Sequence, residues 1–169
     1  MRRFLERLSA KLPERRIIID GELYLQRFYL WGKMPADLAK LWNCGETPKE
    51  RLGFLKTTYL HCFHLPDKDR DCHNHPWKGW GRILVGGYTE ERWIGHPSNP
   101  SSFKTLIHRR QFAKQELQPN DYHRVATLDD PTVWTLFRIG DYEQSWGYWS
   151  EAERRHVPHQ ERHANPNED

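Results

Sequence analysis

Short segments in which apolar and polar residues alternate run through most of the chain between residues 17 and 150. A period of two places apolar side chains on one face of a strand, and turn residues between such segments favour chain reversals. Residues 17–30 predict a hairpin that turns at Asp20-Gly21. The same pattern continues in residues 55–65, 82–93, 103–112, 123–127, 133–139 and 142–149. The sequence therefore predicts a mainly β protein.

Three other stretches differ from this pattern. Phe4, Leu5, Leu8 and Leu12 recur at helical spacing, so residues 1–16 are predicted to hold an amphipathic helix outside the strands. Residues 32–53 mix prolines and glycines with a short helical pattern and predict an insertion: a lid, a dimer contact or a plain surface excursion. From residue 151 the apolar pattern fades, and residues 151–169 are predicted to form a polar, disordered tail.

Size and composition limit the class of protein. The chain has 169 residues, enough for one domain with a single core, and a formal net charge of +3. No apolar run is long enough to span a membrane, and the N-terminal residues lack the apolar core of a signal peptide, so a cytoplasmic location is expected. Three cysteines, Cys44, Cys62 and Cys72, are too few and too irregularly spaced for a disulfide framework.

A His-x-His pair carries the main chemical signal. In an extended segment, Asp71, His73 and His75 project to one face and Cys72 to the other. Two imidazoles begin a metal site but do not complete one, because a closed coordination sphere needs further ligands. His123 follows a Pro-Asn-Asp turn, directly before an alternating segment, and is the expected third ligand. A chance pair among ten histidines is the competing interpretation.

Together the short strands, the His-x-His pair, a glycine at Gly86 or Gly87 and the later Pro119-to-His123 motif resemble the cupin superfamily. The resemblance covers roughly residues 17–150 and implies a double-stranded β-helix, or jelly-roll, barrel. Gly79 or Trp80 stands where the usual cupin motif has a glutamate ligand, and Asp121 replaces the expected glycine. The chain is thus similar to three-histidine cupins such as thiol dioxygenases, and to small uncharacterised cupin-like proteins of bacteriophages and bacteria.

This resemblance implies one divalent metal ion, Fe, Zn or Mn, bound by His73, His75 and His123. Asp69, Asp71 and His61 are the candidates for a fourth ligand or for a group that orients a ligand. A guanidinium group or an aromatic ring can bind polar and anionic groups of a substrate. The candidate substrate-binding residues are therefore Arg82, Arg109, Arg138, Trp77 and Trp80. The candidate acid–base residues are Tyr88, Tyr122 and Glu90.

Three functions follow. The first is a mononuclear metal enzyme, either an oxygenase or a decarboxylase or isomerase, that acts on a small polar or anionic substrate; phage nucleotide or DNA-base modification is one setting that the resemblance suggests. The second is a metal- or ligand-binding module without catalysis. The third is a nucleic-acid-associated protein, favoured only by the basic ends and the aromatic content. The cupin resemblance also implies a homodimer.

Overall fold

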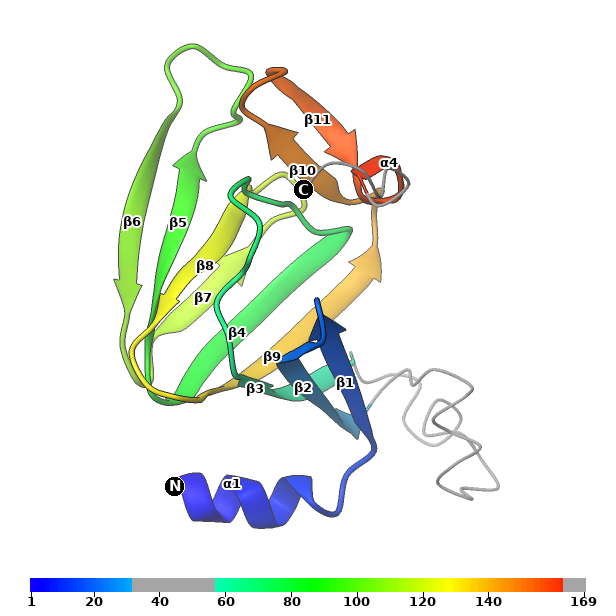
Figure 1. The fold of residues 1–169 in the computed structure, drawn as a ribbon, viewed down its shortest axis with the longest axis vertical. Helices are drawn as coiled ribbons and strands as arrows, with labels where there is room; N and C mark the ends of the chain where they lie inside the picture. The colour runs from blue at the N-terminus through cyan, green and yellow to red at the C-terminus, as the bar shows by residue number, and fades with distance from the viewer. Residues whose placement is uncertain (32–56, 163–169) are drawn as a thin grey trace.

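The computed structural model describes residues 1–31 and 57–162, which form two antiparallel sheets, a terminal hairpin and two helices (Figure 1). The larger sheet has the strand order β1-β2-β3-β9-β4-β7 and the smaller one β6-β5-β8, while β10 pairs with β11. The elements are α1 (Arg2–Ser9), β1 (Glu14–Ile19), β2 (Glu22–Trp31), β3 (Thr58–Phe63), β4 (Trp77–Val85), β5 (Tyr88–Ile94), β6 (Phe103–Arg109), β7 (Lys114–Leu117), β8 (His123–Leu128), β9 (Val133–Tyr142), β10 (Gly147–Ser150), β11 (Arg155–Pro158) and α4 (His159–Arg162).

The first hairpin turns where the sequence predicts it. Asp20 and Gly21 both have positive φ, at 52° and 78°, which is the backbone conformation of a tight hairpin turn. The strands β1 and β2 then pair antiparallel from Ile19 opposite Glu22 to Glu14 opposite Phe28, with one irregularity after Ile17. The predicted mainly β class is confirmed, because all strand pairs in the described residues are antiparallel and helices are few.

The core lies between the two sheets. Ile83 of β4 and Val133 of β9 pack against Tyr88 of β5 and Val125 of β8, so residues from both layers share one buried cluster. These two packed layers form an antiparallel β-sandwich. A second cluster on the same side of the larger sheet is aromatic and contains Tyr29, Tyr59, Leu117, Phe137 and Ile139.

The opposite face of the larger sheet is covered by α1. Leu5, which is 4% exposed, packs with Phe28, Leu60 and Trp134. The helix ends at Ser9 and β1 begins at Glu14, so the first strand starts before residue 17, where the barrel was expected to begin. No helix among the described residues is long and apolar enough to cross a membrane.

The C-terminal prediction is wrong for part of its range. Residues 155–158 form β11 and pair with β10 from Gly147 opposite Pro158 to Ser150 opposite Arg155. Val157 is buried in this strand opposite Tyr148. One buried apolar residue in a charged stretch does not produce an alternating pattern from which a strand can be predicted. Residues 163–169 of the predicted tail and the whole of the predicted insertion at 32–53 lie outside the described residues.

Candidate metal centre

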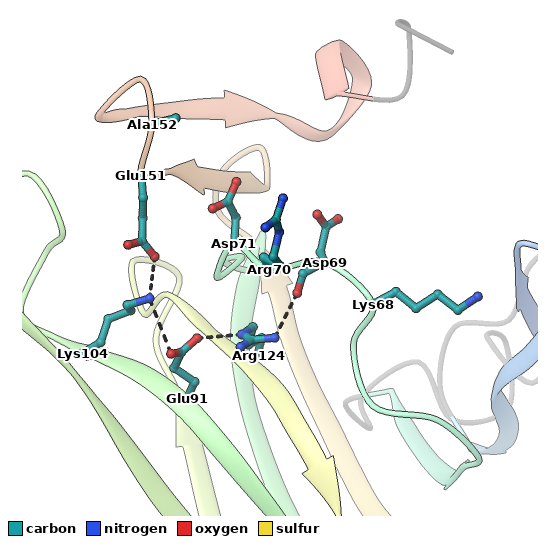
Figure 2. A pocket seen from close by; sticks show the side chains of 9 residues that line it. All are labelled: Lys68, Asp69, Arg70, Asp71, Glu91, Lys104, Arg124, Glu151 and Ala152. Atoms are coloured by element: carbon teal, nitrogen blue, oxygen red, sulfur yellow. Dashed lines mark hydrogen bonds and ion pairs between the residues drawn. The ribbon is translucent and has the colours of Figure 1, made fainter. Parts of the chain in front are cut away.

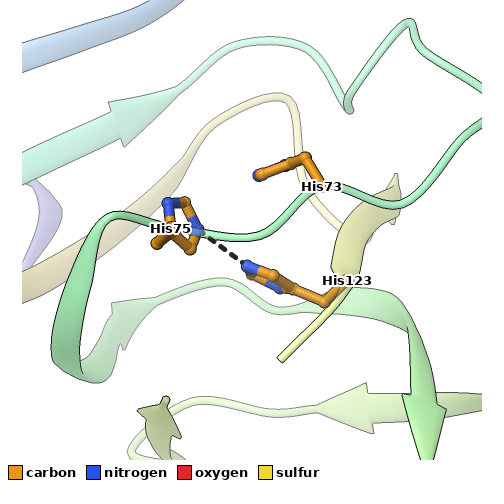
Figure 3. A group of neighbouring side chains, drawn as sticks. All are labelled: His73, His75 and His123. Atoms are coloured by element: carbon orange, nitrogen blue, oxygen red, sulfur yellow. Dashed lines mark hydrogen bonds between the residues drawn. The ribbon is translucent and has the colours of Figure 1, made fainter. Parts of the chain in front are cut away.

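The backbone brings the first and third histidines together. His73 lies in the long connection between β3 and β4, and His123 is the first residue of β8. Each donates its backbone N–H to the carbonyl oxygen of the other, at 2.9 Å in both directions. In such an antiparallel pair the two side chains project to the same face. His75, two residues later in the connection, projects to that face as well (Figure 3).

The three imidazoles form a compact triangle. Their ring centroids are 5.0 Å apart for His73 and His75 and 5.1 Å apart for each of the pairs with His123. One nitrogen of each ring lies within 4.8 Å of the others, and the Nε2 atoms of His75 and His123 are 2.9 Å apart. Two imidazole nitrogens bound side by side to an ion at about 2.1 Å are roughly 3 Å apart. The donor set therefore fits one small metal ion.

Burial favours the neutral, metal-binding form of His73 and His75. Burial lowers the pKa of His73 to about 4, and burial together with the neighbouring His73 and His123 holds the pKa of His75 well below its usual value. The charge of Arg27 also lowers the pKa of His75. A neutral imidazole has a lone pair for a metal ion, whereas a protonated one has none.

Glu90 of β5 stands behind His123. Its Oε1 atom lies 2.8 Å from Nδ1 of His123, an ion-pair distance, although Nδ1 has no hydrogen-bond partner of good geometry. Gln115 donates to Oε1 at 2.8 Å, and Arg109 donates to the other carboxylate oxygen. Burial alone would raise the pKa of Glu90, but His123 and Arg109 together lower it to about 2. A carboxylate at Nδ1 favours the tautomer whose Nε2 lone pair faces the other two histidines.

Aromatic rings surround the three-histidine group. Trp77 stacks on His75, with centroids 4.4 Å apart and planes 12° apart. Trp146, directly before β10, and Tyr148, in β10, approach His73 edge-on at 6.3 and 6.0 Å. Trp77 was expected at the site, whereas no local pattern pointed to Trp146 or Tyr148.

The structure does not bring the three further ligand candidates into this group. Asp69 and Asp71 line a polar surface pocket that also contains Lys104 and Arg124 (Figure 2). His61 is on β3, where its Nε2 atom accepts a hydrogen bond from Arg27 Nε at 3.2 Å. Among the described residues, His73, His75 and His123 are the histidine, cysteine, aspartate or glutamate side chains that gather closely enough to hold an ion.

Most of the arginine and tryptophan candidates point elsewhere. Arg82, Arg138 and Trp80 are exposed. The inward positions of β4 are occupied by Gly79, Gly81 and Ile83, and the neighbouring inward position of β9 is occupied by Phe137. Arg109 lies inside but is paired with Glu90. Arg124, which alternation predicts to point outward, forms an ion pair with Glu91 at 2.6 Å beside the polar pocket.

The candidate acid–base tyrosines have neutral hydrogen-bond partners. Tyr88 donates to Gln115 Oε1 at 2.8 Å, in the interior beside Glu90. The hydroxyl of Tyr122 lies 2.8 Å from Nδ1 of His156, on the side of the smaller sheet that packs against Trp149. Burial raises the pKa of Tyr122 to about 12 and that of Tyr88 further. Arg27 of β2 was not among the residues selected from the sequence. It also lies on the interior face of the larger sheet, where it contacts His61.

The described residues form an antiparallel β-sandwich with three neighbouring histidines. No protein-family model matches the sequence, and no curated protein sequence matches it. Solved structures similar to this chain include HppE in its Fe(II) form, with a TM-score of 0.48, 10% identity and coverage of 78% of this chain and 57% of HppE. Oxalate decarboxylase from Lactobacillus farciminis has a TM-score of 0.48 and 12% identity over 81% of this chain and 32% of that one.

A third similar structure is CapF with an inhibitor, at a TM-score of 0.45 and 8% identity, covering 84% of this chain and 33% of CapF. HppE, oxalate decarboxylase and CapF are cupin-fold proteins. The chain spans little more than half the length of HppE and about a third of the other two. At these identities the likeness concerns the fold, and the chemistry of the site has to come from the side chains of this chain.

Proposed function

We propose that this protein is a metal-dependent enzyme in which His73, His75 and His123 hold one divalent ion. The observation that supports this most directly is the 2.9 Å approach of the His75 and His123 Nε2 atoms within a group of three imidazoles, of which His123 is buried and the other two are half-buried. Three imidazole nitrogens without a protein carboxylate among them resemble catalytic sites that keep positions open, rather than closed structural sites.

A bound ion would supply Lewis acidity and open positions for a substrate atom, water or oxygen. The residues around it have separate tasks. Glu90 holds His123 in the tautomer that binds metal, and Trp77 fixes the plane of His75 by stacking. Trp146 and Tyr148 exclude water from the His73 side. The site thus suits a small polar or anionic substrate, in an oxygenase or in a decarboxylase or isomerase.

Elemental analysis of protein purified without a nickel column tests the metal. We expect close to one equivalent of iron, zinc or manganese in the wild type and little in His75→Ala. His108→Ala is the matched control, because His108 is a half-exposed histidine on β6 that contacts Asp129. Equal metal in both variants, or none in the wild type after reconstitution, would contradict the proposal.

The identity of the ion then selects the assays. Iron directs the search to oxygen consumption with small thiols, amino acids and modified nucleotides, and zinc or manganese directs it to decarboxylation and isomerisation of small carboxylates. Turnover that disappears in His75→Ala and persists in His108→Ala would support an enzyme. A bound ion that raises the melting temperature without any turnover would support the metal-binding module instead.

A further inference from the structure

The connection that carries His73 and His75 has a neighbouring segment on each side. His73 exchanges both backbone hydrogen bonds with His123, whereas the next residue, Asn74, directs its N–H to the other side. This N–H donates to the Gly147 carbonyl at 3.0 Å, and the side-chain oxygen of Asn74 accepts from the Gly147 N–H at 2.9 Å. The ligand-bearing connection therefore lies between β8 and the segment that enters β10, as a middle strand lies between its partners.

Gln144, in the loop between β9 and β10, contacts both ligand-bearing segments. Its side-chain nitrogen, Nε2, donates to the carbonyl oxygen of Pro119 at 2.6 Å and to that of His75 at 3.3 Å. Its backbone N–H donates to the carbonyl oxygen of Pro76 at 3.3 Å, and the Glu143 N–H donates to the same oxygen at 2.6 Å. A side-chain amide carries two N–H groups, so one nitrogen can serve both carbonyls.

Pro119 belongs to the turn that leads into β8. Within this turn the N–H of Asp121 donates to the Gln118 carbonyl at 3.0 Å, and the Asp121 carboxylate accepts from the Gln118 N–H at 2.6 Å. These two bonds close the turn just before His123, the first residue of β8. The Pro119 carbonyl is therefore held in place relative to His123, and the amide of Gln144 joins it to the other ligand-bearing segment.

The separation of His75 and His123 decides whether the two imidazoles can share an ion. Their Nε2 atoms are 2.9 Å apart, and a metal site tolerates deviations of only about 0.2 Å in its metal–ligand distances. His75 lies in the connection between β3 and β4, outside any regular strand, so the pairing of the sheets does not by itself set its position. A side chain that holds this connection against the Pro119 turn can supply the missing constraint.

We propose that Gln144 is a positioning residue of the candidate metal centre, whose side-chain amide sets the distance between the imidazoles of His75 and His123. This inference rests on the proposed function, and it adds a residue that acts on the ion only through the ligands. Gln144 is half-buried, whereas its loop neighbour Ser145 is exposed and supplies a matched control.

The first test loads the metal-free full-length protein with Co²⁺, whose visible absorption spectrum depends on the geometry of its ligands. Gln144→Met keeps the length of the side chain and removes both N–H donors. We expect this variant to bind Co²⁺ about 10–100-fold more weakly than the wild type and with a shifted spectrum, and Ser145→Ala to match the wild type in both. A Gln144→Met protein that melts at a lower temperature but keeps the wild-type Co²⁺ affinity and spectrum would overturn the positioning role.

The second test needs no metal ion. NMR signals of the imidazole nitrogens in the metal-free proteins report the contact between the Nε2 atoms of His75 and His123. We expect these signals to move in Gln144→Met and to stay in Ser145→Ala, and unchanged signals in Gln144→Met would overturn the inference. Signals that move, in a protein whose wild type binds no metal, would overturn the proposed function and leave the role of Gln144 in place. If Gln144→Met does not fold, Gln144→Glu, which keeps the shape and lacks the N–H donors at neutral pH, carries both comparisons.

Discussion

The buried carboxylate of Glu90 joins two kinds of interaction at one residue. It contacts His123 through Oε1 and accepts a hydrogen bond from Arg109 through Oε2, and it is fully buried. Glu91, its neighbour on β5, points to the opposite face and pairs with Arg124 and Lys104. Adjacent residues of one strand therefore separate a carboxylate that serves the histidine group from one that serves the surface.

Replacing Glu90 with glutamine should weaken metal binding by about 10–100-fold, because the change removes the charge that orients His123 while nearly preserving the side-chain shape. The dissociation constant is measured by competition with a chelating dye. Glu91→Gln is the control and should bind metal as the wild type does. Identical constants for the two variants would show that the Glu90 contact does not support the site.

The buried histidines should make the metal-free protein sensitive to mild acid. His61 and His73 have a lowered pKa in the folded chain, mainly through burial, whereas an unfolded chain protonates histidine near pH 6.5. Below that pH the unfolded state therefore takes up protons that the folded state cannot, and the free energy of unfolding falls. The expected slope is about 1.4 kcal/mol per pH unit for each such histidine.

Urea unfolding at pH 7.5, 6.5 and 5.5 measures this slope. The variant His61→Gln should lose part of it, since one protonation difference between the two states is removed. A free energy of unfolding that stays constant from pH 7.5 to 5.5 would contradict the burial of neutral histidines as the structure has it.

Gly79 of β4 leaves room for aromatic rings that pack against this strand. A Cβ added at Gly79 would lie 2.6 Å from the Phe137 ring and 2.9 Å from the Trp77 ring. Both distances are too short for contact between carbon atoms, and Trp77 stacks on His75. The missing side chain at Gly79 therefore lets two aromatic rings pack beside the candidate metal site.

Gly79→Ala should lower the free energy of unfolding by about 1–3 kcal/mol, the usual cost of overpacking, and should also weaken metal binding through Trp77. Gly140→Ala on β9 is the matched control, because its added Cβ would meet Lys78 O at 3.4 Å and Trp80 at 3.8 Å, which are tolerable contacts. Denaturant melts of both variants give the comparison. A Gly79→Ala protein as stable as Gly140→Ala would contradict the close packing.

The sequence predicted the elements whose own residues specify them. The hairpin of β1 and β2 follows from a β-branched run and Asp20-Gly21, and the common face of His73 and His75 follows from alternation alone. The segment that holds them is a bridged connection rather than a regular strand, yet the backbone pairing of His73 with His123 preserves the alternation. Strand β7 was missed, because its four residues, Lys114–Leu117, include three polar ones at a sheet edge.

The contacts of the site that were not predicted depend on long-range register. Glu90 meets His123 only because β5 pairs with β8, and Arg27 meets His61 only because β2 pairs with β3. Neither pairing leaves a trace in the sequence around those residues. Arg82, Arg109 and Arg138 were selected by their charge, which a sequence shows, whereas the inward or outward face of a strand depends on its partners.

The three histidines come from segments of both layers of the fold. His73 and His75 belong to the connection between two strands of the larger sheet, and His123 begins a strand of the smaller one (Figure 1). The same connection is fixed to β8 at Asp67, whose N–H donates to the Val125 carbonyl at 2.9 Å and whose carboxylate accepts from Val125 N–H at 2.6 Å. An ion at the three histidines would therefore bind the folded arrangement of both layers and have little affinity for the unfolded chain.

Metal loading should consequently stabilise the fold in a concentration-dependent way. At a free metal concentration one hundred times the dissociation constant, binding to the folded state alone adds about 2.7 kcal/mol, which corresponds to a rise in melting temperature of roughly 5–10 °C for a chain of this size. Differential scanning calorimetry over a metal titration measures the rise, and a chelator should reverse it. His75→Ala should melt at the same temperature with and without metal, because two remaining imidazoles bind an ion weakly. A rise of the same size in His75→Ala would place the stabilising ion elsewhere on the protein.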